Sequence, residues 1–179
     1  MRSKSHGIGA MTDRQSIDVT ACGLSLRIEP ATVVLRPNQT PTVTARLTNN
    51  SARSLTLVLP GDGSRMGRRT PVIEWVFMPG GRVVAFEGCG NINGLRLGEV
   101  FTLQPAETRD LGTWVAPLAL PAQSRFHGVM VYTNEPDLPF RGVLLRPHDE
   151  DELARLHRSD RCRVESNKIE FITEGERAS

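Results

Sequence analysis

Residues 24–48 read LSLRIEPATVVLRPNQTPTVTARLT, and this stretch decides the class of fold. In its first part, Leu24, Leu26 and Ile28 alternate with polar residues, and the same alternation returns over residues 42–48. Because successive side chains of a β-strand point to opposite faces, each run predicts a strand with one buried face. The intervening RPNQT contains the proline and asparagine typical of a turn. We therefore expect two strands joined by a turn.

Runs of the same kind follow along the chain. We expect further strands at residues 55–59, 73–77, 99–103, 107–114 and 125–133, and a hairpin turn at PGGR, residues 79–82. The strand at 125–133 has apolar residues on both faces, which predicts a central strand covered on both sides. About eight short strands without a helical repeat predict an all-β fold, an antiparallel immunoglobulin-like sandwich.

The last predicted strand contains a change of phase. Val164 begins one alternation, whereas Ile169 and Phe171 belong to the opposite one. One extra residue in a strand moves every later side chain to the other face, so a β-bulge is expected near Ser166 and Asn167.

A single helix is expected at residues 150–158, inside an insertion at 134–161 that precedes the last strand. Asp149 and Glu152 have the spacing of a capping box, and Leu153 and Leu156 lie on one face. Basic residues occupy the last turns, where the negative end of the helix dipole favours them.

The composition is that of a globular domain and limits the classes of partner. The 179 residues are 39% hydrophobic and 23% charged with a net charge of +2, which does not favour a nucleic-acid or membrane-surface binder. No apolar run approaches the roughly 18 residues that span a bilayer. We expect residues 1–20 to be a disordered leader, residues 21–174 a single sandwich domain, and residues 175–179 a disordered tail.

The cysteines leave two alternatives. Three cysteines exclude a complete disulfide framework, but Cys22 and Cys162 precede the first and last predicted strands, which often lie side by side in a sandwich. Three reduced thiols are the simpler interpretation, because no apolar leader is present in the sequence. The expected location is therefore cytoplasmic.

Several fragments in order resemble a known family. LRIEP, LRPNQTPTVTARLTNNS, LQPAETRDL, RFHGVMVYTN and the closing VESNKIEF are similar to immunoglobulin-like β-sandwich proteins of bacteria, a family without an assigned activity. The resemblance spans about residues 20–173 and implies the architecture, but it transfers no catalytic residue. The long insertion before the last strand departs from a minimal sandwich and leaves the strand order open.

The loop at residues 59–71, LPGDGSRMGRRTP, is the main candidate site. Its glycine spacing does not fit a P-loop or a dinucleotide fingerprint, and it lacks the oxygen ligands of a calcium loop. Free backbone amides and a clamp of arginines could still hold an anion or a partner. The residues proposed for this are Arg65, Arg68, Arg69, Gly61 and Gly63, together with Asn91 of the CGNIN segment. An exposed turn explains the same residues without a ligand and is the simpler interpretation.

Three other groups of residues suggest weaker sites. Cys89 with His127 could form a thiol nucleophile and its base, although a packed thiol in a turn is simpler. The acidic segment HDEDE at 148–152 could bind a hard metal ion, although the start of a helix explains it equally. Trp75 and Trp114 are expected in the core. We therefore assign no catalytic residue, cofactor or metal.

The function that these patterns favour is that of a non-enzymatic binding or accessory domain, acting through loops at one end. The expected partner is a protein or a small anion, with neither nucleic acid nor membrane involved. Two alternatives stay open: a protease-inhibitor-like module of the intracellular bacterial type, and an enzyme that depends on Cys89.

Overall fold

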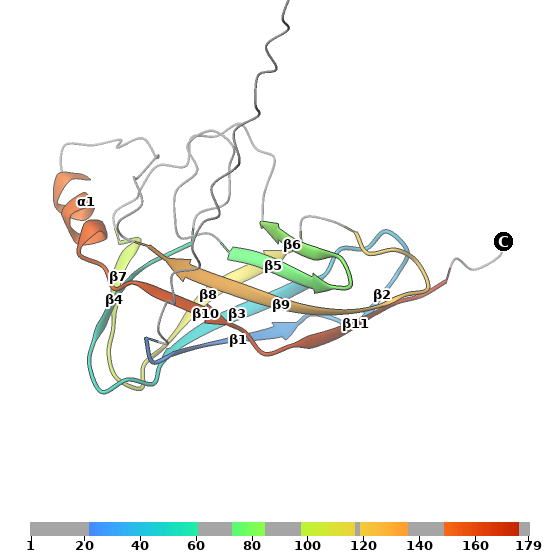
Figure 1. Ribbon diagram of the computed structural model, residues 1–179, viewed down its shortest axis with the longest axis horizontal. Coiled ribbons are helices and arrows are strands. Elements are labelled where there is room, and N and C mark those ends of the chain that lie inside the picture. Colours follow the sequence, from blue (N-terminus) through green and yellow to red (C-terminus); the bar gives the residue numbers. More distant parts are fainter. Residues whose placement is uncertain (1–21, 61–72, 85–97, 117–118, 136–148, 176–179) are drawn as a thin grey trace, which may run out of the picture.

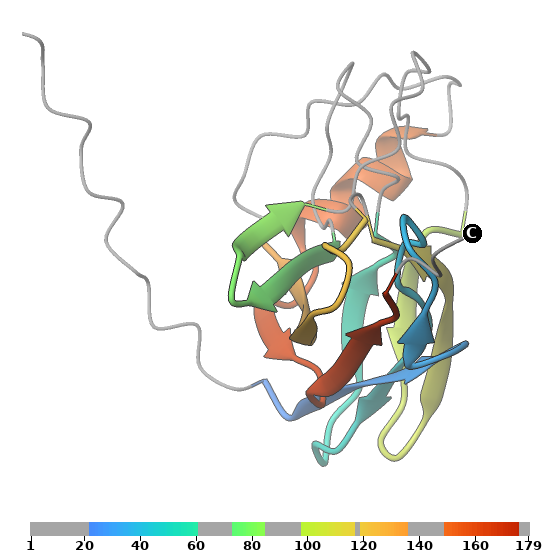
Figure 2. The same cartoon turned by 90° about the vertical axis from the view of Figure 1, so that its right-hand side faces the viewer.

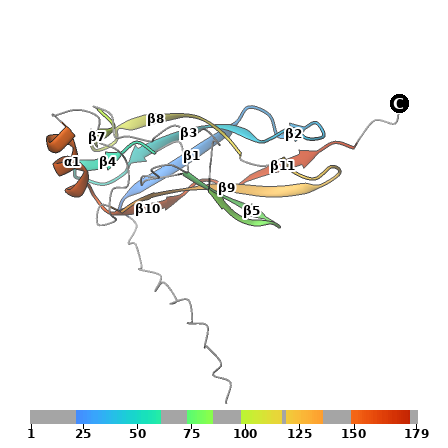
Figure 3. The ribbon, with the colours of Figure 1, turned by 90° about the horizontal axis from the view of Figure 1, so that it is seen from above.

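The computed structural model of the chain describes residues 22–60, 73–84, 98–116, 119–135 and 149–175. These residues form an all-β sandwich of two facing layers, with a helix at one end, as Figures 1 and 3 show. The all-β class predicted from the alternating runs is therefore confirmed. No helix in the described ranges is long and apolar enough to cross a membrane.

The described ranges hold eleven strands, where about eight were expected. The elements are β1 Leu24–Pro30, β2 Val34–Leu35, β3 Thr42–Asn49, β4 Leu55–Val58, β5 Ile73–Met78, β6 Gly81–Val84, β7 Val100–Leu103, β8 Thr108–Val115, β9 Arg125–Asn134, α1 Asp149–His157, β10 Cys162–Glu165 and β11 Ile169–Thr173. The number differs chiefly because the last predicted strand is divided into β10 and β11, and because β2 is too short to show any periodicity.

One layer is the sheet β1-β3-β8, and the other has the order β2-β11-β9-β5-β6, with β10 also pairing with β9. β4 and β7 form a separate two-stranded sheet at the end that carries α1 (Figure 3). Seen along the sandwich in Figure 2, β5 and β6 (green) lie on one side and β8 (yellow) lies on the other, with β11 (dark red) between them. β9 pairs with β5, β10 and β11, so its predicted central position is confirmed.

The core lies between the two layers and follows the period-two patterns. Trp75 is fully buried and stacks on Phe77, with ring centroids 5.3 Å apart and planes 5° from parallel. Trp114 is only half-buried, and its indole Nε1 donates to the carbonyl of Leu111 at 3.1 Å. The prediction of two core tryptophans is thus confirmed for Trp75, whereas Trp114 packs at the margin of the core.

The predicted irregularity in the last strand is present, and it joins the two layers. Between β10 and β11, the Ser166 amide donates to the Met130 carbonyl, and the Met130 amide donates to Ser166 Oγ, both at 2.9 Å. The side chain of Asn167 accepts from the Ile28 amide at 2.8 Å and donates to the Ile28 carbonyl at 3.1 Å. Asn167 therefore occupies backbone groups of β1 that another strand would otherwise use.

Two more strands at sheet margins have backbone groups occupied by nearby side chains. In β2, the Val34 amide donates to Thr32 Oγ1 at 3.3 Å, and the same hydroxyl donates to the Val34 carbonyl at 2.9 Å. In β8, the register shifts beside Arg46, and the Gly112 amide donates to Asp110 Oδ1 at 2.6 Å. Such local bonds satisfy groups that an open sheet edge would present to another chain.

Candidate functional site

The strand ends that flank the predicted loops converge at the α1 end of the sandwich. Val58, the last residue of β4, pairs with Val100 at the start of β7. Ile73, the first residue of β5, pairs with Tyr132, two positions before β9 ends at Asn134. Val84, the last residue of β6, pairs with Glu74 beside the start of β5, so the described residues that flank 61–72, 85–97 and 136–148 lie at or near this end.

The residues predicted to bind a partner or an anion lie in these segments. Arg65, Arg68, Arg69, Gly61 and Gly63 fall in residues 61–72, and Asn91 falls in residues 85–97, outside the described ranges. The structure therefore places the strand ends that carry the candidate site but not its side chains, and the site stays a prediction.

Helix α1 packs beside these strand ends, close to its expected position. The predicted helix 150–158 is observed as Asp149–His157. Leu156 forms a small buried cluster with Val58 and Val100, and the Arg155 guanidinium donates to the Val100 carbonyl at 2.8 Å. His148 of the acidic segment lies outside the described ranges, and no group of three potential metal ligands occurs within them.

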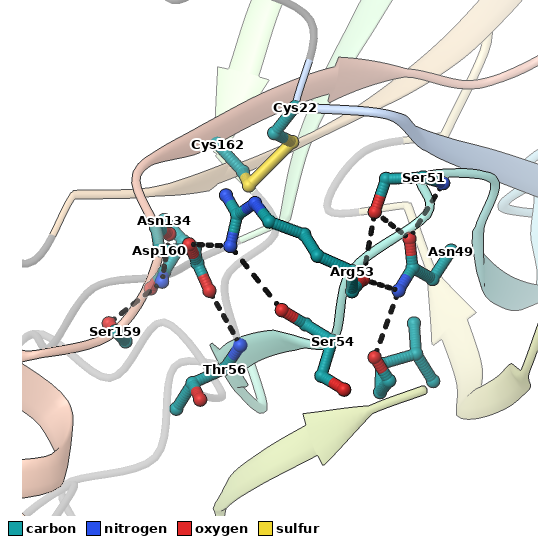
Figure 4. Close-up of polar contacts among 11 residues, drawn as sticks. Cys22, Asn49, Ser51, Arg53, Ser54, Thr56, Asn134, Ser159, Asp160 and Cys162 are labelled. Carbon is teal, nitrogen blue, oxygen red and sulfur yellow. Dashed lines mark hydrogen bonds and ion pairs between the residues drawn. A yellow bond between two sulfur atoms is a disulfide. The ribbon is translucent and has the colours of Figure 1, made fainter. Parts of the chain in front are cut away.

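A polar network fixes the segment after α1 to the turn between β3 and β4 (Figure 4). Asp160 accepts from the Thr56 amide and from the Arg53 guanidinium, both at 2.7 Å, and its own amide donates to the Thr56 carbonyl at 2.7 Å. The buried Asn134 side chain donates to Ser159 Oγ at 2.9 Å and to the Asp160 carbonyl at 2.8 Å. This segment therefore pairs with β4 much as a short strand would.

Asn49 holds the other side of the same turn. Its side-chain amide donates to the carbonyls of Arg53 at 2.8 Å and Leu103 at 2.9 Å. Its Oδ1 accepts from the amide and the hydroxyl of Ser51, at 2.9 and 2.6 Å. Because Asn49 is fully buried, these four bonds satisfy a group that would otherwise destabilise the fold.

Tyr132 connects β9 to β4 beneath the converging strand ends. Its hydroxyl donates to the Val58 carbonyl at 2.8 Å. Burial disfavours the phenolate and raises the pKa of Tyr132 well above its ordinary value, although the hydrogen bond with Val58 opposes the shift in part. The phenol therefore keeps its proton in the folded chain and serves as a structural hydrogen-bond donor.

A disulfide joins Cys22 to Cys162, with their Cα atoms 5.5 Å apart. The simpler expectation, three reduced thiols, is therefore corrected, and the pairing of cysteines beside the first and last strands is the alternative that the structure adopts. The physical reason is the topology, because β10 returns alongside the start of β1 and brings the buried Cys162 to Cys22. Figure 4 shows this bond beside the Arg53–Asp160 ion pair.

His127 lies far along β9 from the converging strand ends. It pairs with Met78 at the end of β5 and with Glu170 of β11. Cys89, its proposed partner, lies outside the described ranges, so the structure does not test this pair and the cysteine-enzyme hypothesis stays a prediction.

Comparison with family models and with curated proteins finds no match. Among solved structures, the chain is similar to Spo0M, a sporulation control protein from Bacillus subtilis, with a TM-score of 0.42 and 10% sequence identity. The likeness covers 86% of this chain and 50% of Spo0M, so the chain spans about half the length of that protein.

Proposed function

We propose that the chain is a non-enzymatic binding or accessory domain, and that the segments leaving the α1 end contact its partner. The observation that carries this proposal is the convergence of the ends of β4, β5, β7 and β9 at one end. The glycine- and arginine-rich segments start from these ends, and polar loops on a rigid scaffold are a common location for binding residues.

The scaffold beneath the segments supports the same proposal. The Cys22–Cys162 disulfide, the Asp160 pairing with β4 and the Tyr132 hydrogen bond all lie at this end. Fixed strand ends reduce the conformational entropy that the loops lose when they become ordered on a partner. The expected partner is a protein or a small anion held by Arg65, Arg68 and Arg69.

We also propose that the sandwich is immunoglobulin-like. The strand order supports this, because β1, β3 and β8 share one sheet as strands A, B and E do in that fold. The order β11-β9-β5-β6 in the facing sheet corresponds to strands G, F, C and C′. An experimental structure with β8 in the same sheet as β9 would overturn this assignment.

The test of the binding proposal replaces the three loop arginines together by alanine. The matched control replaces Arg27, Arg46 and Arg125, which lie on strands elsewhere and pair with Glu29 or Glu170. Both triple variants lose the same charge, so a non-specific electrostatic effect would appear in both.

The expected result is that the loop variant loses partner capture and phosphate binding while the control keeps both, with equal melting temperatures. Partners would be captured from a native lysate, and inorganic phosphate would be titrated separately to identify an anion site. Recovery of the same partners and the same phosphate affinity by the loop variant would refute the proposal.

A cytoplasmic location remains a proposal, and the disulfide supplies its test. Thiols in the cytoplasm are kept reduced, whereas disulfides persist in oxidising compartments. Alkylation in denaturant at the moment of cell lysis, which also exposes the buried Cys162, should therefore label Cys22 and Cys162 if the protein resides in the cytoplasm. Protection of both cysteines would place the folded protein in an oxidising compartment instead.

A further inference from the structure

A second surface lies at the opposite end of the sandwich, where β2 and the end of β11 meet (Figure 1). A hollow of about 600 Å³ is bounded there by the turn after β2 and by Glu174. A neighbouring hollow of about 290 Å³ shares Arg36, Pro37 and Glu174 with it. The larger hollow alone is within the range of volumes of small-molecule sites, roughly 300–1,000 Å³, and it is open to solvent.

The turn that forms one wall is held in a single conformation by local bonds. Pro37 and Asn38 occupy its centre, Asn38 has φ of 63°, and the Gln39 amide donates to the Arg36 carbonyl at 3.1 Å. Proline followed by a left-handed asparagine is the pattern of a type II turn. The Arg36 amide in turn donates to Gln39 Oε1 at 3.0 Å, so this wall is formed before any ligand arrives.

Two opposite charges lie side by side in the hollow without pairing. Ile172 pairs with Val34 and Thr173 with Leu35, so the next step of the parallel register places Glu174 beside Arg36 on the same face. The Glu174 amide confirms this position by donating to the Leu35 carbonyl at 2.9 Å. Both side chains are exposed and line the hollow, yet neither forms an ion pair with any described residue.

The same hollow contains an apolar surface. Val34 lines it and is 45% exposed. Its neighbour in the register, Ile172, is half-buried on the same face of the sheet. The hollow therefore combines a cation, an anion and an apolar contact at the end of two adjacent strands.

We propose that this hollow binds a small zwitterion with an apolar side chain, of the amino-acid or dipeptide class. Its carboxylate would lie against the Arg36 guanidinium, its ammonium against the Glu174 carboxylate, and its side chain against Val34. An α-amino group and a carboxylate match the two unpaired charges with opposite sign, and a mono-charged ligand would satisfy only one of them. This site is independent of the segments at the α1 end.

The test is an NMR titration of the full chain with L-leucine and with leucyl-leucine, read at the backbone amides of Val34, Arg36, Gln39 and Glu174. Because the contacts are exposed to water, we expect saturable shifts with a Kd of roughly 1–10 mM. Two analogues separate the charges: 4-methylpentanoate lacks the ammonium, and 3-methylbutylamine lacks the carboxylate. Each should bind at least about threefold more weakly than leucine.

Arg36→Gln and Glu174→Gln should each weaken leucine binding to a similar degree. The control variants Arg46→Gln and Glu29→Gln remove an exposed pair on another sheet and should leave the titration unchanged. Stronger binding of the dipeptide than of leucine would identify a peptide end as the ligand. Shifts that do not saturate, that sodium chloride alone reproduces, or that persist in both hollow variants would overturn the proposal.

Discussion

Removal of the Cys22–Cys162 disulfide should destabilise the chain more than any other change at the α1 end. The two cysteines are separated by 140 residues, and cross-linking so long a segment restricts the unfolded chain strongly. The loop-entropy relation gives about 17 cal/mol/K for this length, or about 5 kcal/mol at 25 °C. Since residual structure in the unfolded chain reduces such values, we expect a measured loss of about 3–5 kcal/mol.

The assay is urea unfolding of the native chain, of the chain with a reductant, and of the double variant Cys22→Ser, Cys162→Ser. Cys89→Ser is the matched control, because it removes a cysteine that does not belong to the bond. Thiol titration in denaturant should find one free thiol in the chain as purified, and all three cysteines after reduction. Three free thiols in the purified chain, or equal stability of the double variant and the control, would refute the reasoning.

Three further predictions concern single residues. Burial raises the pKa of Tyr132, so its stabilising effect is complete below about pH 10 and is lost as the pH rises further. Because Tyr132 is the single tyrosine of the chain, absorbance at 295 nm should stay constant until the protein unfolds, and a gradual rise in the folded state would contradict this. Asp160→Ala should lower the free energy of unfolding by about 1–3 kcal/mol, because it leaves the Thr56 amide without its acceptor. The control Glu29→Ala, on the exposed surface, should lower it by less than about 1 kcal/mol in the same urea assay. Gly23→Ala should lower the melting temperature more than Gly112→Ala. Both glycines have positive φ, but only at Gly23 of the two would a Cβ approach another side chain, that of Ser51, to 2.7 Å. Equal melting temperatures would show that this contact relaxes freely.

The strands were predictable because their signal is local. Alternation over a few residues located β1, β3 and β5, and the change of phase between Val164 and Ile169 located the irregularity that Ser166 and Asn167 form. The helix was predictable from its acidic start and the spacing of its leucines. Each of these features depends on residues fewer than about ten positions apart.

The features that sequence reasoning missed depend on distant residues. The two residues of β2 show no period, and their pairing with β11 becomes evident only once the chain has folded back. The charges in the hollow are adjacent only because this parallel register places Glu174 beside Arg36. Three cysteines allow three single pairings, and topology selects one of them. The loop arginines lie outside the described residues, so the hypothesis that they bind a partner rests on the sequence alone.

The side chains that occupy backbone groups at the sheet margins have a consequence for the evolution of assembly. Thr32, Asp110 and Asn167 each satisfy backbone groups with one short side chain, so a single substitution exposes those groups. In β2, replacement of Thr32 frees the Val34 amide and carbonyl and favours pairing of that edge with a second molecule, whereas β1 keeps its bridge from Leu26 to Ser166 and β8 keeps its register shift. A change at this one exposed threonine would therefore alter self-association without any change in the core.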